Sequence, residues 1–158
     1  MELDTSTRKG IETFIARQTK VKSCAIVDLH RLSGGAIQEN WYLDVDIPSG
    51  PYSGRLEAVL RTDATSKIAV SLSRAQEFSL IKAAFDAGVT VPEPLWLNND
   101  PSVTGTDFFI MRRISGHAAG HRLVKNERVI KNGERLVERL AEELAKIHSV
   151  KPSAELEF

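Results

Sequence analysis

A pair of glycines between two strand-like segments is the part of this sequence best suited to chemistry. Ser33, Gly34, Gly35 and Ala36 form the core of the segment Arg31–Ala36. Adjacent glycines allow several backbone N–H groups to turn outward together, and such a loop suits the binding of a phosphate. A glycine pair between strands is also an ordinary hairpin turn. The loop by itself leaves both interpretations open.

An arginine in a later predicted strand offers a positive charge to such an anion. Arg61 follows Val59 by two positions in the predicted strand Leu56–Thr62. Side chains two apart on a strand face the same side of the sheet. The guanidinium therefore lies beside an apolar side chain, on the surface that the glycine loop would cover, where a bound anion would meet it.

A glutamate in the next predicted helix shares its face with apolar residues. Glu77 lies on the same helical face as Leu80, Ile81 and Ala84. A carboxylate on an apolar face is costly unless a cation pairs with it, and Arg61 is the natural candidate. Glu77 also lies in the first turn of the helix, where the macrodipole alone favours a negative charge. The spacing alone does not show whether Glu77 pairs with Arg61 or is stabilised only by the helix macrodipole.

Hydrophobic periodicity predicts the elements that must position these residues. The predicted helices are Thr7–Thr19 behind a cluster of Thr and Ser residues that can cap it, Ser73–Ala87 with a Ser73–Gln76 capping box and a stop at Gly88, and a final helix capped near Asn132. The predicted strands are Ser23–Leu32, Gln38–Ile47, Leu56–Thr62, Leu95–Leu97 and Phe108–Met111. The expected fold class is α+β, with one antiparallel sheet of five strands.

The final helix carries an apolar stripe at helical spacing, formed by Leu136, Leu140, Leu144 and Ile147. A stripe of this kind normally faces a core. We expect it to pack against the sheet or against a further lobe.

Composition limits the class of protein. With 158 residues, zero net charge and 42% hydrophobic residues, the chain is large enough for one domain with one core. It shows no leader and no apolar run near the ~20 residues that cross a bilayer, so we expect a cytoplasmic protein with no membrane partner. Cys24 is the sole cysteine, which excludes a disulfide framework, and its apolar neighbours predict core packing.

Two other patterns receive simpler interpretations. His117 and His121 have the spacing of a helical zinc pair, but Gly116 and Gly120 disfavour a helix and no third ligand lies nearby, so we expect surface histidines and no metal site. Basic residues outnumber acidic ones over positions 112–139. Without net charge or interleaved aromatic residues, this pattern indicates a solvated helix face and no nucleic-acid partner.

Taken in order, five segments resemble the aminoglycoside phosphotransferase-like kinases, which have a protein-kinase-like fold. The similarity is greatest to the bacterial phosphotransferase branch related to the kinase-like domain of some acyl-CoA dehydrogenases, in which an arginine commonly ends the Val-Leu-Arg strand. The matching segments cover nearly the whole chain and are Arg31–Ala36, Ala58–Arg61, Glu77 within Ala75–Gly88, Val91–Leu97 and Phe108–Gly116.

The resemblance implies a nucleotide-binding N-terminal lobe whose glycine loop, Ser33–Ala36, folds over the phosphates of ATP. Arg61 would hold the α- and β-phosphates, and Glu77 would orient Arg61. Ile37 departs from the family, which usually has a small hydroxyl residue at that point. A side-chain contact to phosphate there is therefore in doubt, whereas the backbone contacts of the loop are unaffected.

The resemblance also assigns the residues that would surround the adenine base. Met111 looks like the gatekeeper, and Val59 would pack on the ring. The hinge would run from Arg112 to Ile114, with the backbone carbonyl of Arg112 and the backbone amide of Ile114 bonding the base. These assignments depend on backbone groups at the hinge, so side-chain identity matters little there.

The catalytic segment of the family has no counterpart in this sequence. Its His-Gly-Asp motif is absent, and no Asp follows Asp107, so the general base and both Mg²⁺ ligands are missing. We expect residues 1–116 to form the nucleotide-binding lobe and residues 117–158 to be the segment and first helix leading to a C-terminal lobe that this chain lacks. The chain alone would then be inactive.

Two functions remain open on the sequence alone. The favoured one is the ATP-binding lobe of an enzyme that transfers phosphate from ATP, with Mg²⁺, to a hydroxyl of a small molecule. The alternative is a non-catalytic nucleotide-binding or interaction module with the same fold. Without a partner lobe, the cleft face with Val59 and Met111 would expose apolar surface, and we expect it to form a homodimer.

Overall fold

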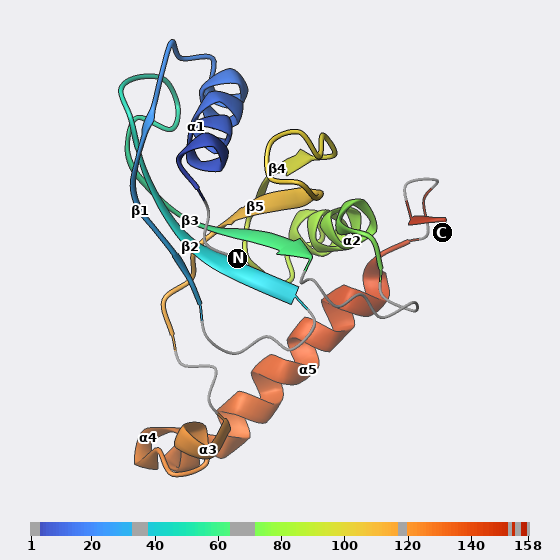
Figure 1. The fold of residues 1–158 in the computed structure, drawn as a ribbon. Coiled ribbons are helices and arrows are strands. Elements are labelled where there is room, and N and C mark those ends of the chain that lie inside the picture. Colours follow the sequence, from blue (N-terminus) through green and yellow to red (C-terminus); the bar gives the residue numbers. More distant parts are fainter. Residues whose placement is uncertain are drawn as a thin grey trace.

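A five-stranded antiparallel sheet organises the chain, as Figure 1 shows. The computed structural model describes residues 4–32, 38–63, 72–116, 120–151, 153 and 156–157. The strands are β1 (Ala25–Arg31), β2 (Gln38–Ile47), β3 (Gly54–Asp63), β4 (Pro94–Asn98) and β5 (Phe108–Arg112), in the spatial order β1-β2-β3-β5-β4. Each predicted strand is present, with ends that differ by two residues at most. The predicted α+β class is confirmed.

The helices are α1 (Thr5–Thr19), α2 (Arg74–Asp86), α3 (Gly120–Leu123), α4 (Glu127–Lys131) and α5 (Gly133–Ser149). The short helices α3 and α4 were not predicted, and they lie at the start of α5, away from the sheet (Figure 1). None of the described helices combines the length and the apolar character needed to cross a bilayer.

The first helix begins two residues earlier than predicted, because its cap is Asp4 and not a Thr or Ser. The Asp4 carboxylate accepts a hydrogen bond from the Thr7 backbone N–H at 2.7 Å. This bond satisfies one of the free N–H groups of the first turn and also lowers the pKa of Asp4. Ile11, Phe14 and Ile15 are buried on the side that faces the sheet.

The main core lies between α1 and one face of the sheet. Alternate residues of β2 point into it, and those of β3 and β5 do the same, because side chains alternate across a strand. The core residues of these strands are Trp41, Leu43, Val45, Ile47, Leu56, Ala58, Leu60, Phe108 and Ile110. Phe14 of α1 meets Phe108 edge to face, with ring centroids 5.3 Å apart. Cys24 is buried in the same cluster, as predicted.

Helix α2 packs on the opposite face of the sheet and has the predicted ends. The Ser73 hydroxyl accepts from the Gln76 N–H at 3.2 Å, and the Gln76 side chain accepts from the Ser73 N–H at 2.8 Å, so the capping box is complete. Gly88 has a φ of 76° just after the helix, a backbone conformation that favours glycine. Phe78 contacts Phe109 with ring centroids 5.8 Å apart, which fixes α2 against β5.

The apolar stripe of α5 is not part of a core among the described residues. The prediction that it packs against the sheet is wrong. Leu136, Leu140, Leu144 and Ile147 are 44–60% exposed. Periodicity identifies the helical face that gains from burial, but it does not show that anything covers that face. The Asn132 side chain also makes no cap hydrogen bond, contrary to expectation.

Glu143 joins α5 to the segment between α2 and β4. One carboxylate oxygen accepts from the Thr90 backbone N–H at 2.6 Å, and the other accepts from the Thr90 hydroxyl and from Lys146, both at 2.8 Å. The Lys146 ammonium, followed by the Thr90 N–H, lowers the pKa of Glu143 from 4.5 to about 2. The carboxylate form of Glu143 is therefore the one that holds this contact.

We predict that the Thr90–Glu143 contact is lost in acid. Because the pKa of Glu143 is lower in the folded chain than its ordinary 4.5, the contact contributes its full stability above about pH 4.5 and loses it as the pH falls toward 2. The amide proton shift of Thr90, followed by NMR, should titrate with a midpoint at about pH 2. Glu143→Gln should abolish that titration, whereas Glu142→Gln, at the exposed neighbouring position, should leave it intact. A wild-type midpoint near 4.5 would contradict the prediction.

Candidate functional site

The sheet face opposite α1 gathers the predicted site residues of the strands. Val59 lies opposite Tyr42 of β2 on one side and Met111 of β5 on the other. Arg61 lies two residues further along β3 and faces the same side. Val59 is 8% exposed. Tyr42, Val59 and Met111 therefore form one row across the three strands, and Arg61 lies beside this row.

The ion pair between Arg61 and Glu77 is present. The Arg61 Nη2 atom lies 2.6 Å from the Glu77 Oε1 atom, so the carboxylate of α2 does face the strand arginine. This resolves the choice left open by spacing in favour of pairing. The Arg61 guanidinium also donates to the Asn40 Oδ1 atom at 3.2 Å and to the Gln38 side chain, while its buried Nε has no hydrogen-bond acceptor among the described residues.

A second arginine, which sequence reasoning missed, holds Glu77 from the other side. Arg74 is 1% exposed and is one of the largest fully buried side chains in the described structure. Its guanidinium pairs with the Glu77 carboxylate, lies 2.9 Å from the Asp63 carboxylate through Nε, and donates to the Leu72 carbonyl at 3.1 Å. Arg74 therefore ties the start of α2 to the end of β3.

Arg74 was missed because a charged residue in the first turn of a helix is ordinarily solvated. The i, i+3 spacing of Arg74 and Glu77 is the one local signal for their pairing. The contact of Arg74 with Asp63 joins a helix to a strand, and no pattern in the sequence predicts it. A buried arginine of this kind is stable only while both carboxylates remain beside it.

Backbone groups of the last residue of β5 and of the residues just after it make up the rest of the predicted site. The N–H of Arg112 donates to the Glu93 carbonyl at 2.8 Å, and the N–H of Arg113 donates to the Glu57 carbonyl at 3.1 Å. Ile114 is 59% exposed, and none of the described residues accepts a hydrogen bond from its N–H.

The structure thus brings Val59, Arg61, Glu77 and Met111 together on one face, with Arg112 and Ile114 at its edge. The glycine loop, Ser33–Ala36, lies outside the described residues, and so does His117. His121 is exposed, as expected. In the part of the chain that the structure describes, no group of three His, Cys, Asp or Glu side chains is arranged to hold a metal ion.

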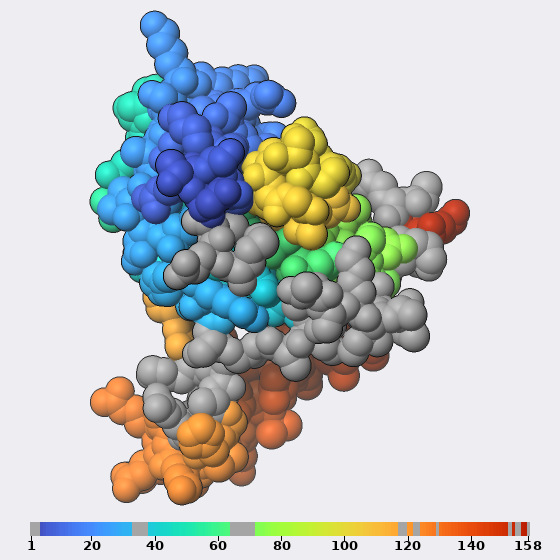
Figure 2. Space-filling view, in the orientation of Figure 1, coloured from blue at the N-terminus to red at the C-terminus, as the bar shows by residue number. Residues whose placement is uncertain are grey.

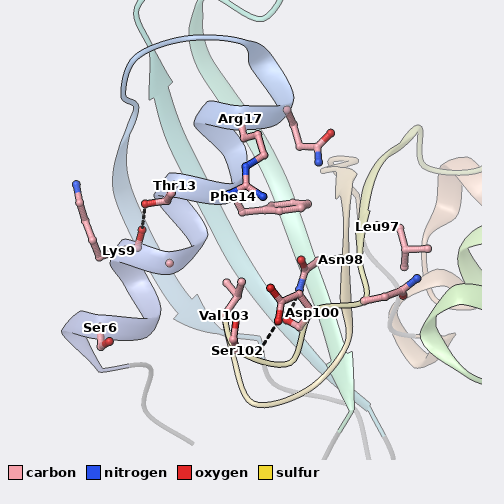
Figure 3. A pocket seen from close by; sticks show the side chains of 13 residues that line it. Ser6, Lys9, Thr13, Phe14, Arg17, Leu97, Asn98, Asp100, Ser102 and Val103 are labelled. Carbon is pink, nitrogen blue, oxygen red and sulfur yellow. Dashed lines mark hydrogen bonds between the residues drawn. The ribbon is translucent and has the colours of Figure 1, made fainter.

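A cavity of about 680 Å³ lies elsewhere, between α1 and the segment that joins β4 to β5 (Figure 3). Figure 2 shows these two segments, in blue and yellow, side by side at the surface. The lining includes Arg17, Asn98, Asp100 and Val103, and it contains none of the predicted site residues. The Asp100 carboxylate is engaged by the Ser102 N–H at 2.9 Å. This cavity lies on the α1 side of the sheet, away from Arg61, and we assign it no role in the site.

We predict that Arg74→Ala lowers the free energy of unfolding by about 2 kcal/mol. Removing one member of a buried ion pair costs about 3–5 kcal/mol, and the loss here is smaller because Glu77 keeps Arg61 and Asp63 is partly exposed. Urea denaturation followed by circular dichroism measures the change. Arg135→Ala, at an exposed position of α5, serves as the control and should change stability little. Equal stability of the two variants would show that the Arg74 network does not hold α2.

Comparisons with known proteins identify a family for this chain. The model of the phosphotransferase enzyme family matches residues 28–158. Among curated proteins, acyl-CoA dehydrogenase family member 11 from Gallus gallus is 46% identical over 41 residues, which make up 26% of this chain and 5% of that protein. A solved structure described as an aminoglycoside phosphotransferase from Ralstonia eutropha is 19% identical, with a TM-score of 0.49, and the match covers 70% of this chain and 29% of that one.

This chain therefore spans less than a third of the length of either relative. The family match, in contrast, includes part of β1, all of β2 to β5, the Arg61–Glu77 pair and the residues that follow β5. The chain belongs to the phosphotransferase enzyme family.

Proposed function

We propose that the face with Val59 and Arg61 binds ATP, and that this chain is the nucleotide-binding lobe of a phosphotransferase that acts on a hydroxyl of a small molecule. The observation that carries the proposal is the Arg61–Glu77 ion pair, with its N–O distance of 2.6 Å, beside an apolar row in a member of this family. A guanidinium fixed by a carboxylate is already oriented when a phosphate arrives.

The chemistry of Arg61 supports a phosphate ligand. A guanidinium carries five N–H donors in a rigid fork that matches phosphate oxygens. Gln38, Asn40 and Glu77 engage its Nη1 and Nη2 atoms, and the buried Nε has no acceptor among the described residues. The Arg61 side chain is 21% exposed, so a ligand can reach its outer N–H groups, and an anionic oxygen is the strongest acceptor for them.

The residues beside Arg61 support a base as the other half of the ligand. Val59 and Met111 provide an apolar surface next to the arginine. The Ile114 N–H offers a donor, and the Arg112 carbonyl offers an acceptor. Adenine presents an amino donor beside a ring acceptor, and this pattern matches a backbone carbonyl followed by a backbone N–H.

Magnesium accompanies ATP in phosphoryl transfer and neutralises the charge that develops on the phosphates. The described residues do not supply a site for it, since they hold no group of three metal-ligating side chains. Neither a His-Gly-Asp motif nor any Asp after Asp107 occurs in this sequence. We therefore propose that this chain contributes nucleotide binding and no catalytic base.

Arg61→Ala is the test of the phosphate assignment. The wild-type chain should bind ATP weakly, with a Kd of ~0.1 mM or poorer, because one lobe offers about half of a closed site. The variant should bind at least about tenfold more weakly, since a charge-assisted hydrogen bond contributes about 1.5–3 kcal/mol. NMR titration of the chain with ATP measures both constants.

The matched control is Arg55→Ala, which removes another arginine from the same strand and the same face. Arg55 pairs with Asp46 at 2.6 Å and lies at the far end of β3 from Arg61. Its loss should leave ATP affinity unchanged. If Arg61→Ala and Arg55→Ala bind ATP as tightly as the wild type, Arg61 does not hold the phosphates. If the wild type binds no ATP, the proposed function is wrong.

A second test separates nucleotide binding from catalysis. Incubated with ATP, Mg²⁺ and a panel of small hydroxyl compounds, this chain should release no phosphate and form no phosphorylated product. The physical reason is that the general base and the metal ligands of this reaction belong to a His-Gly-Asp motif and a following Asp, and the sequence has neither that motif nor any Asp after Asp107. Phosphorus NMR follows all the species in one experiment. Turnover that Arg61→Ala abolishes would overturn the assignment of a purely binding role to this chain.

A further inference from the structure

Arg113 follows the last residue of β5, and its side chain turns back to the two neighbouring strands. Its Nη1 atom donates to the Asp44 carboxylate of β2 at 2.6 Å, and its Nη2 atom lies 2.6 Å from the Glu57 carboxylate of β3. Its backbone N–H donates to the Glu57 carbonyl at 3.1 Å. One residue therefore ties the chain beyond β5 to both β2 and β3.

The same guanidinium also stacks on an aromatic ring. The Arg113 Cζ atom lies 3.8 Å from the centroid of the Tyr42 ring, and the His30 ring of β1 stacks on that ring at 4.5 Å. Partial burial, followed by the Asp44 charge, raises the pKa of the Tyr42 phenol. Tyr42 therefore stays neutral at ordinary pH and can donate to Asp44. Cation–π contacts are strongest when the cation is removed from water, and the Arg113 side chain is mostly buried.

These contacts connect the chain beyond β5 to the proposed base site. Tyr42 lies directly opposite Val59 across the β2–β3 pair, and Val59 lies opposite Met111 across the β3–β5 pair. Arg113 thus fixes the position of the following residue, Ile114, relative to that row. Because the Ile114 side chain is exposed, its own packing does little to hold the backbone there.

We propose that Arg113 is a positioning residue that sets selectivity for the adenine base. The inference rests on the proposed function and extends it to the choice of nucleotide. With Arg113 in place, the Arg112 carbonyl and the Ile114 N–H face the base as an acceptor followed by a donor. Adenine carries an amino donor where guanine carries a carbonyl acceptor, so a backbone held in this order accepts ATP and rejects GTP.

The experiment compares ATP, GTP and inorganic tripolyphosphate as ligands of the whole chain. The wild type should bind ATP more tightly than GTP and tripolyphosphate. Arg113→Ala should weaken ATP binding about fivefold to tenfold, the loss expected for one or two hydrogen bonds, and leave tripolyphosphate binding unchanged. The ratio of ATP affinity to GTP affinity should fall toward one. Arg113→Lys should not restore the ratio, because an ammonium cannot bridge two carboxylates as a planar fork does.

Arg8→Ala is the control. Arg8 lies on α1, and its guanidinium donates to the backbone carbonyl of Ile26 in β1, on the face of the sheet opposite the proposed site. Its loss should leave all three affinities unchanged. Glu57→Gln, which keeps Arg113 and removes one partner charge, gives a milder version of the Arg113→Ala result and remains informative where Arg113→Ala does not fold.

Three outcomes decide the proposal. A fall in the ATP/GTP ratio with unchanged tripolyphosphate binding supports it. An equal loss of all three ligands, or an unchanged ratio in both Arg113→Ala and Glu57→Gln, overturns it and leaves Arg113 a structural residue. If the wild type binds neither nucleotide more tightly than tripolyphosphate, the base site of the proposed function is wrong as well. This failure is seen with the wild-type chain alone, whereas failure of the Arg113 proposal is seen only when the variants are compared with the wild type.

Discussion

Glu77 lies between two guanidinium groups, and the geometry of the whole site depends on this arrangement. Arg61 reaches it from the middle of the sheet, and Arg74 reaches it from its own helix while contacting Asp63 at the end of β3. The carboxylate thus fixes the distance between α2 and β3. Phe78 packs against Phe109 beside these ion pairs, and α2 also contacts β4. Apolar packing places the helix on the sheet, and the ion pairs orient Arg61.

The features that the sequence predicted correctly are those whose chemistry is local. The Ser73–Gln76 capping box and the stop at Gly88 lie within one helix, and both are present. Alternation within each strand predicted that Val59 and Arg61 share a face, since a strand has only two faces. The resemblance to a family is confirmed by the family match over residues 28–158. The five strands and the row of site residues could therefore be predicted from the amino-acid sequence.

The features that could not be predicted depend on partners from other elements. Arg74 looks like a solvated helix residue until Asp63 is placed beside it. Arg113 looks like one more charge in a basic segment until Tyr42, Asp44 and Glu57 surround it. The α5 stripe shows the opposite error, since its period describes a face that gains from burial and carries no information on what covers that face. In each case the surroundings of the side chain depend on how close it lies to segments that are far away in the sequence.

The order of strands in the sheet has a consequence for how the site forms during folding. Strands β1, β2 and β3 are consecutive neighbours, so their pairing closes only short loops, whereas the pairing of β5 with β3 closes the longer loop that contains α2 and β4. Closing that long loop costs more chain entropy and is expected to come later. Val59 belongs to the three strands expected to pair early, and Met111 belongs to β5, which is expected to pair later. The contact between Val59 and Met111 therefore forms only when β5 pairs with β3. A partly unfolded chain that keeps the first three strands would retain Arg61 and lack the surface proposed for the base.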